Sequence, residues 1–154
     1  YYVLNEIPFA DHGALLDPPT SDVTARCVAL LAKHDFDHYQ PVIERALQYL
    51  EKEQEESGAW FGRWGTNYIY GTWSVLVALE FARVAVDHPM MRRAAAWLKS
   101  VQHDDGGWGE TNDSYETVAL AGAAPRSTAF QTAWAILGLL AAGEGECDAI
   151  RRGI

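Results

Sequence analysis

Asp22 and Arg26 are the charged pair whose types and spacing first suggest chemistry. Residues four apart on a helix share a face, so this carboxylate and this guanidinium can form an ion pair. Asp22 also falls in Thr20-Ser21-Asp22, three residue types that cap helix N-termini. Taken alone, the two residues favour a helix cap and an intrahelical ion pair, and a role beside a reacting group stays open.

Two aromatic residues, Trp64 and Tyr70, offer a second kind of chemistry. Aromatic faces attract cations, at roughly 0.5–2 kcal/mol each depending on desolvation. Without further information, aromatic side chains at such positions indicate core packing. The remaining candidates are weaker. The histidines show no metal-ligand spacing, so we expect no metal, and the short acidic runs indicate solvated turns: His34, His38, His88, His103, Asp35-Phe36-Asp37 and Asp104-Asp105.

The elements that must hold these residues are helices. Apolar residues recur with helical spacing, and no sustained period-two run predicts a strand. Residues 1–20 contain four prolines or glycines and predict an ordered loop. A connection is expected over 35–40 and a long loop over 109–126. The predicted helices run from about Thr20 to His34, Pro41 to Gln54, Tyr70 to Val84, Pro89 to Gln102 and Ser127 to Ala142.

One pattern occurs twice, over 45–60 and 93–108. Both copies read Arg-Ala, an aromatic residue and Leu, then Gln and Gly-x-Trp, at the same internal spacing. A third copy begins at Arg152-Gly153 and is cut off at Ile154. A period near 48 residues predicts paired helices stacked into a solenoid or closed barrel. It also leads us to expect that the chain is part of a longer protein.

The repeated residues have a structural explanation. Gln54 and Gln102 stand at the expected ends of helices, where the last carbonyl groups lack partners. We expect each amide to donate to such a carbonyl and to accept from the start of a neighbouring helix. Trp60 and Trp108 would then pack over the amides and tie one repeat to the next.

The repeat resembles the QW motif of the squalene–hopene cyclase family, and the resemblance covers the chain. It extends to several segments: Asn5 to Asp11, Leu16-Asp17-Pro18-Pro19, Asp22-Val23-Thr24-Ala25, Trp60 to Gly65 with Asn67-Tyr68 and Tyr70-Gly71-Thr72, Gly106 to Glu110, and Gln131 to Ala135. The resemblance implies an all-α fold, a partial (α/α) barrel from the C-terminal half of a cyclase. It also implies proton-initiated cyclization of squalene to pentacyclic hopene or hopanol, without a cofactor.

The resemblance further implies roles for individual residues. The proton donor of the family is the middle Asp of an Asp-x-Asp-Asp motif, which this chain lacks, so we expect it to be inactive alone. Asp22, Arg26 and Tyr70 match the supporting shell of that acid. Arg26 stands where the family often has His. Since Arg keeps its proton near neutral pH, a charge or hydrogen-bonding role is implied rather than a proton relay.

Four further positions match the substrate-binding cavity of the family. Trp64 matches an aromatic wall, and Asp17 matches a position near the network of the acid. Phe9 and Ala10 match the loop that narrows the substrate entrance.

Composition limits the partners. A net charge of -9 argues against nucleic acid, which binds clustered Lys and Arg. The longest apolar run, Ala133 to Ala142, is about half of what crossing a bilayer requires, so we expect neither a membrane-spanning segment nor a signal peptide in this sequence. A cyclase of this type takes its substrate from a membrane. The resemblance therefore implies that the full-length protein binds one leaflet of a bacterial inner membrane from the cytoplasmic side. A homodimer is compatible with the resemblance.

Other functions compete with this one. One alternative is a fragment of a cyclase that acts on oxidosqualene or another polyprene, because most residues that select the substrate are absent from this chain. A non-catalytic helical-repeat module that only packs or binds fits the missing acid. A protein prenyltransferase β-type barrel shares the helix pairing, but it needs a zinc site of Asp, Cys and His that is not spaced correctly here.

Overall fold

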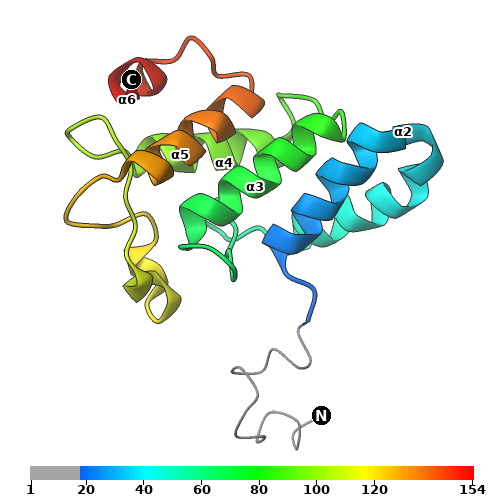
Figure 1. Cartoon of the computed structure of the whole chain (residues 1–154), viewed down its shortest axis with the longest axis horizontal. Coiled ribbons are helices and arrows are strands. Elements are labelled where there is room, and N and C mark those ends of the chain that lie inside the picture. The colour runs from blue at the N-terminus through cyan, green and yellow to red at the C-terminus, as the bar shows by residue number, and fades with distance from the viewer. Residues whose placement is uncertain (1–17) are drawn as a thin grey trace, which may run out of the picture.

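The structure is a computed structural model that describes residues 18–154, and every regular element among them is helical. Figure 1 labels the five α-helices, and two short 3-10 helices, η2 and η3, lie in the loop before α5. The all-α prediction is confirmed for the described residues. The bounds are α2 Ser21–Lys52, α3 Tyr68–Phe81, α4 Pro89–Ser100, η2 Asn112–Tyr115, η3 Val118–Leu120, α5 Ala129–Ala141 and α6 Asp148–Gly153.

Helix α2 is two helices joined at one residue. Asp35 has non-helical backbone angles (φ -161°, ψ 87°), and its Oδ1 accepts a hydrogen bond of 3.1 Å from the His38 N–H. The carboxylate thereby caps the second half of α2. The predicted connection over 35–40 is wrong for this reason, since a side-chain cap restarts the helix without a loop. Pro41 consequently lies inside the second half rather than in its first turn.

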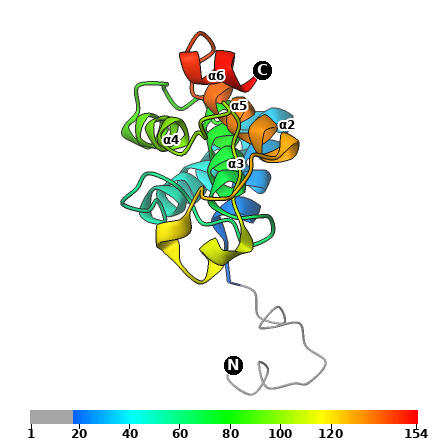
Figure 2. The same ribbon diagram turned by 90° about the vertical axis from the view of Figure 1, so that its left-hand side faces the viewer.

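The helices form two layers. Figure 1 shows the first half of α2, α3 and α5 side by side, and Figure 2 shows α4 and the second half of α2 on one side of them. α3 packs against both α2 and α5. This position explains its almost wholly apolar sequence, since Ile69, Leu76 and Leu79 are all fully buried.

The two repeats make the same hydrogen bonds. The indole N–H of Trp60 donates to the Leu50 carbonyl at 2.7 Å, and that of Trp108 donates to the Leu98 carbonyl at 2.7 Å. Both acceptors lie near the C-terminus of the preceding helix, where carbonyl groups lack helical partners. The indoles therefore take the place that we expected the glutamine amides to fill.

The glutamine amides instead join one repeat to the next. Gln54 Nε2 donates to the carbonyls of Gly58, at 2.8 Å, and Met90, at 3.1 Å. Gln102 Nε2 donates to Gly106, at 2.6 Å, and to Ala149, at 2.7 Å. Met90 and Ala149 lie in the first turns of α4 and α6, so each amide bridges the loop after its own helix to the next outer helix.

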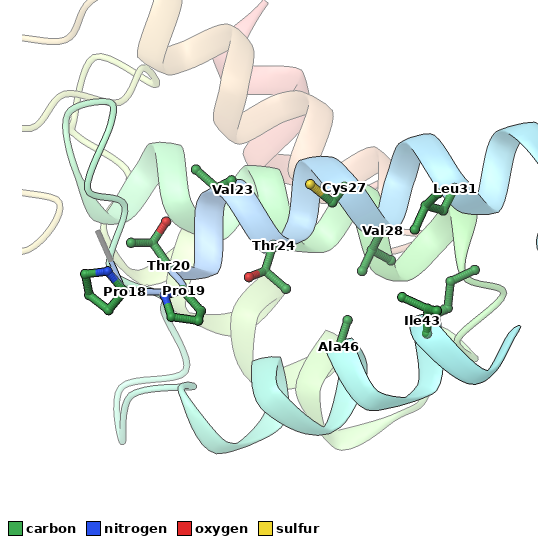
Figure 3. A pocket seen from close by; sticks show the side chains of 11 residues that line it. Pro18, Pro19, Thr20, Val23, Thr24, Cys27, Val28, Leu31, Ile43 and Ala46 are labelled. Atoms are coloured by element: carbon green, nitrogen blue, oxygen red, sulfur yellow. The ribbon is translucent and has the colours of Figure 1, made fainter. Parts of the chain in front are cut away.

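An apolar groove of about 420 Å³ opens between the two halves of α2. Figure 3 shows Val23, Cys27 and Leu31 on one half and Ile43 and Ala46 on the other. None of the predicted site residues in the described part of the chain lines it. No helix within residues 18–154 is long and apolar enough to cross a membrane.

Candidate functional site

Asp22 is a fully buried carboxylate at the start of α2. Its Oδ1 accepts from the Thr20 hydroxyl at 2.6 Å and from the Val23 N–H at 3.0 Å, and its Oδ2 accepts from the Trp64 N–H at 2.8 Å. Both oxygens are thus held by donors, as a buried carboxylate requires. The carboxylate does more than cap its own helix, because one bond reaches the turn before α3.

That turn, residues 62–67, contains Trp64, one of the two predicted aromatic residues, and leads into α3, which contains Tyr70. The Asn67 side chain accepts from the Gly62 N–H at 3.1 Å, which closes the turn. The side chain of Trp64 is 51% exposed, and the guanidinium carbon of Arg63 lies 5.4 Å from its ring centre. The main chain of Trp64 thus donates a hydrogen bond to Asp22, while its exposed ring can line a surface.

Tyr70 stands in the first turn of α3 and is half-buried. A Cβ atom at Gly65 would lie 2.5 Å from the Tyr70 ring, so only glycine at that position lets the ring pack against the turn. On its other side, the ring centre of Tyr70 lies 5.3 Å from that of Trp134 in α5.

Arg26 turns away from the ion pair that its spacing suggested. Among the described residues no ion pair joins Arg26 to Asp22. The guanidinium carbon lies 4.7 Å from the ring centre of Trp73 and 5.8 Å from that of Tyr70. The intrahelical ion pair is therefore wrong here. The physical reason is that Asp22 is already bound by its own donors, whereas the aromatic faces offer the cation a partner.

Three aromatic residues of this site were missed by the sequence analysis. Trp73 and Trp134 stack with ring centres 5.5 Å apart and planes inclined by 10°, and Phe130 meets Trp134 edge-on at 5.0 Å. They continue the surface formed by Tyr70 and Arg26 across α2, α3 and α5. The available signal was a tryptophan in each of two helices that are otherwise almost wholly apolar.

A polar cluster from the loop 109–126 supports the turn from the other side. Glu110 is buried, and its Oε2 accepts from the N–H groups of Asn67, at 3.2 Å, and Ile69, at 2.9 Å. A carboxylate at this place satisfies unpaired N–H groups at the start of α3 and suits the helix dipole. Gln131 in turn binds the main chain of Glu110, with bonds of 3.0 Å to both its N–H and its carbonyl.

Tyr115 belongs to the same loop. Its hydroxyl approaches three carbonyl oxygens of the turn, those of Gly62, Arg63 and Gly65. Burial raises the pKa of the Tyr115 hydroxyl above its ordinary value of 10.0, and the negative charge of Asp22 raises it further. The phenol therefore keeps its proton as a hydrogen-bond donor near neutral pH.

Three predicted substrate-binding residues, Phe9, Ala10 and Asp17, lie outside the described residues. Of the seven predicted catalytic and substrate-binding residues, the structure brings Asp22, Arg26, Trp64 and Tyr70 to neighbouring ends of α2 and α3. Within residues 18–154 no group of three or more His, Cys, Asp or Glu side chains is placed to hold a metal ion. The arrangement offers a held carboxylate, a cation and a continuous aromatic surface.

The sequence is similar to a known family model and to known proteins. The family model described as the squalene-hopene cyclase C-terminal domain matches residues 1–154. The squalene–hopene cyclase of Zymomonas mobilis subsp. mobilis is 57% identical over 155 residues, which cover 100% of this chain and 23% of that protein. That of Bradyrhizobium diazoefficiens is 54% identical over 154 residues, covering 99% and 23%. The chain thus spans about a quarter of the length of these relatives.

A solved structure shares the fold. The ent-copalyl diphosphate synthase from Streptomyces platensis superposes with a TM-score of 0.66 at 21% identity, over 89% of this chain and 25% of that protein. At this identity the likeness concerns the fold alone. It agrees with the helical-barrel architecture expected from the repeats.

Proposed function

This chain belongs to the squalene–hopene cyclase family, and on that premise we propose that the full-length protein cyclizes squalene to a pentacyclic hopene or hopanol. The chain supplies part of its C-terminal barrel domain. The substrate is a long apolar polyene that must be protonated once and then guided as a carbocation. No cofactor is needed for such a reaction.

The observation that carries the proposal is the hydrogen-bonded Asp22 beside the aromatic surface. A carboxylate without an exposed edge suits a role in orienting another acid rather than in donating its own proton. The proton donor would be an Asp-x-Asp-Asp motif in the part of the protein outside this chain. Asp22 and Arg26 would then supply charge and hydrogen bonds to that acid, with Tyr70 between them and the cavity.

The aromatic residues would stabilise the cation as it moves through the ring system. Tyr70 and Trp64 are the proposed wall, and Trp73 and Trp134 extend it. Aromatic faces suit this task because they attract positive charge without acting as bases that would end the cascade early. Phe9, Ala10 and Asp17 are proposed to line the entrance and the surroundings of the acid.

The partners and the location remain part of the proposal. Squalene is held in bilayers, so we propose that the full-length protein binds one leaflet of the bacterial inner membrane from the cytoplasmic side, and that it forms a homodimer. The negative charge of the chain gives no support to a nucleic-acid partner.

The decisive experiment incubates the full-length protein with detergent-dispersed squalene and analyses the products by gas chromatography with mass detection. We expect pentacyclic product from the full-length protein and none from residues 1–154 alone. Product from the isolated chain would contradict the assignment of the acid to the missing part. No product from the full-length protein with squalene would contradict the proposed function.

One variant and one alternative substrate extend that assay. Tyr70→Ala should lower product yield strongly, because it removes a ring that packs against Trp134 and lies near the Arg26 guanidinium. An unchanged yield would remove Tyr70 from the site. A parallel incubation with oxidosqualene tests the alternative substrate. A non-catalytic packing module, the other alternative, predicts no product from either substrate.

A further inference from the structure

The Tyr115 hydroxyl, in the loop 109–126, contacts the main chain of the turn at 62–67. It lies 3.1 Å from the Gly62 carbonyl oxygen and 3.3 Å from that of Arg63, and it also hydrogen-bonds the Gly65 carbonyl. A phenol has one proton, so it donates to one of these carbonyls at a time while the other two stay within reach of its dipole. Three carbonyl groups of one short turn therefore point to a single hydroxyl group.

The ring of Tyr115 is itself held in place. It meets the ring of Phe61 edge-on, with ring centres 5.6 Å apart, just before the turn begins. Two further contacts join the same two segments: Asn67 Nδ2 donates to Ser114 Oγ at 3.2 Å, and Thr66 Oγ1 lies 3.1 Å from Asn112 Oδ1. The 3-10 helix η2 thus lies along the turn as a clamp.

The contacts of η2 with the turn fix the Trp64 N–H, the group that binds Asp22. Trp64 lies between Arg63 and Gly65, two of the residues whose carbonyls meet Tyr115, and its N–H donates to Asp22 Oδ2 at 2.8 Å. Each peptide unit is planar, so fixing the carbonyl of Arg63 also fixes the direction of the Trp64 N–H in the same unit. The position of the Asp22 carboxylate therefore depends on a residue 93 positions later in the chain.

We propose that Tyr115 is a positioning residue for the cyclization reaction, whose hydroxyl keeps the Trp64 N–H directed at the Asp22 carboxylate. This inference rests on the proposed function of the full-length protein. Tyr115 does not touch the reacting atoms; it acts through the turn. The long loop 109–126 accordingly serves the site as a support built from another repeat.

The test is Tyr115→Phe in the full-length protein, which removes one oxygen and leaves the ring against Phe61. We expect kcat for squalene to fall about 10-fold with KM changed less than about twofold, because the loss concerns orientation at the reacting centre. The thermal unfolding midpoint should fall by no more than a few degrees. The matched control is Tyr39→Phe in the second half of α2, away from the site, which should leave both constants unchanged.

A double variant separates positioning from general weakening. If Tyr115 acts through Asp22, then Tyr115→Phe combined with Asp22→Asn should have the same residual kcat as Asp22→Asn alone. With an active wild type, three results would each overturn the inference. The kcat losses of the two single variants could multiply in the double variant. The kcat of Tyr115→Phe could be unchanged, or its loss could be explained by partial unfolding at the assay temperature. Absence of pentacyclic product from the wild type would overturn the proposed function and this inference with it.

Discussion

The backbone N–H of Trp64 donates a hydrogen bond of 2.8 Å to Oδ2 of Asp22, two residues that stand 42 positions apart. The bond ties the first turn of α2 to the turn that precedes α3. A main-chain donor makes the contact independent of the side chain at position 64. The exposed indole can therefore line a surface without disturbing the carboxylate.

Asp22→Asn tests the importance of this contact. The amide keeps the shape of the carboxylate but turns one buried acceptor into a donor. Either the Trp64 N–H loses its acceptor, or the Thr20 hydroxyl and the Val23 N–H lose theirs. We expect kcat to fall at least 10-fold and the free energy of unfolding to fall by about 1–3 kcal/mol. Squalene turnover and urea denaturation of the full-length protein measure the two effects.

Asp104→Asn is the matched control for that variant. Asp104 is exposed in the turn after α4, so the same change of chemistry removes no buried bond. Both kcat and the unfolding midpoint should stay at their wild-type values. Equal losses of kcat and of stability in Asp22→Asn and Asp104→Asn would show that the bond to Trp64 does not contribute to either property.

Trp60→Phe tests the indole bond that closes each repeat. Phenylalanine keeps most of the buried ring but removes the N–H that satisfies the Leu50 carbonyl, so we expect a loss of about 2–4 kcal/mol from the unpaired carbonyl and the smaller ring together. Trp97→Phe, at a side chain that is also buried, reports the effect of ring size at a tryptophan outside the Gly-x-Trp positions. Chemical denaturation that gave the same loss for both would argue against the role of the N–H.

Gly58→Ala tests the junction between repeats. Gly58 has φ of 98°, and an added Cβ would lie 2.6 Å from the Arg93 carbonyl oxygen, which is too close for any real contact. We expect a loss of about 1–3 kcal/mol from backbone strain and displacement of α4. Gly145→Ala provides the control, since its Cβ would meet nothing closer than 3.6 Å. A thermal melt in which both variants unfold together with the wild type would refute the prediction.

The tyrosines predict how stability depends on alkaline pH. Burial raises the pKa of Tyr49, Tyr68 and Tyr115 above 10.0 in the folded protein, so between 10.0 and the raised values the unfolded chain loses protons that the folded chain keeps. Their contribution is complete below about pH 10 and is lost as the pH rises through the folded values. Urea midpoints measured from pH 8 to 11 should stay level and then fall, less steeply in Tyr115→Phe. A midpoint that rose above pH 10 would contradict the direction of these shifts.

Much of the fold follows from local sequence. The apolar runs predicted α3 and α5, observed at Tyr68–Phe81 and Ala129–Ala141, because a helix buried on several sides needs apolar residues all round. The break near Asp35 was also predicted, but not its length. A single side-chain hydrogen bond decided that length, and helical spacing carries no information about such a bond.

The sequence by itself determined the helical class and the repeated Gln and Trp positions, since these depend on residue type and spacing along the chain. The family resemblance of the sequence supplied the candidates Asp22, Arg26, Trp64 and Tyr70. Only the tertiary structure decided the partners of those residues. Arg26 lies on Trp73 instead of pairing with Asp22, and Tyr115 and Glu110 meet the turn at 62–67 across more than 40 residues. The physical reason is that such contacts depend on how α2, α3 and α5 pack together, and packing brings together groups that no local pattern relates.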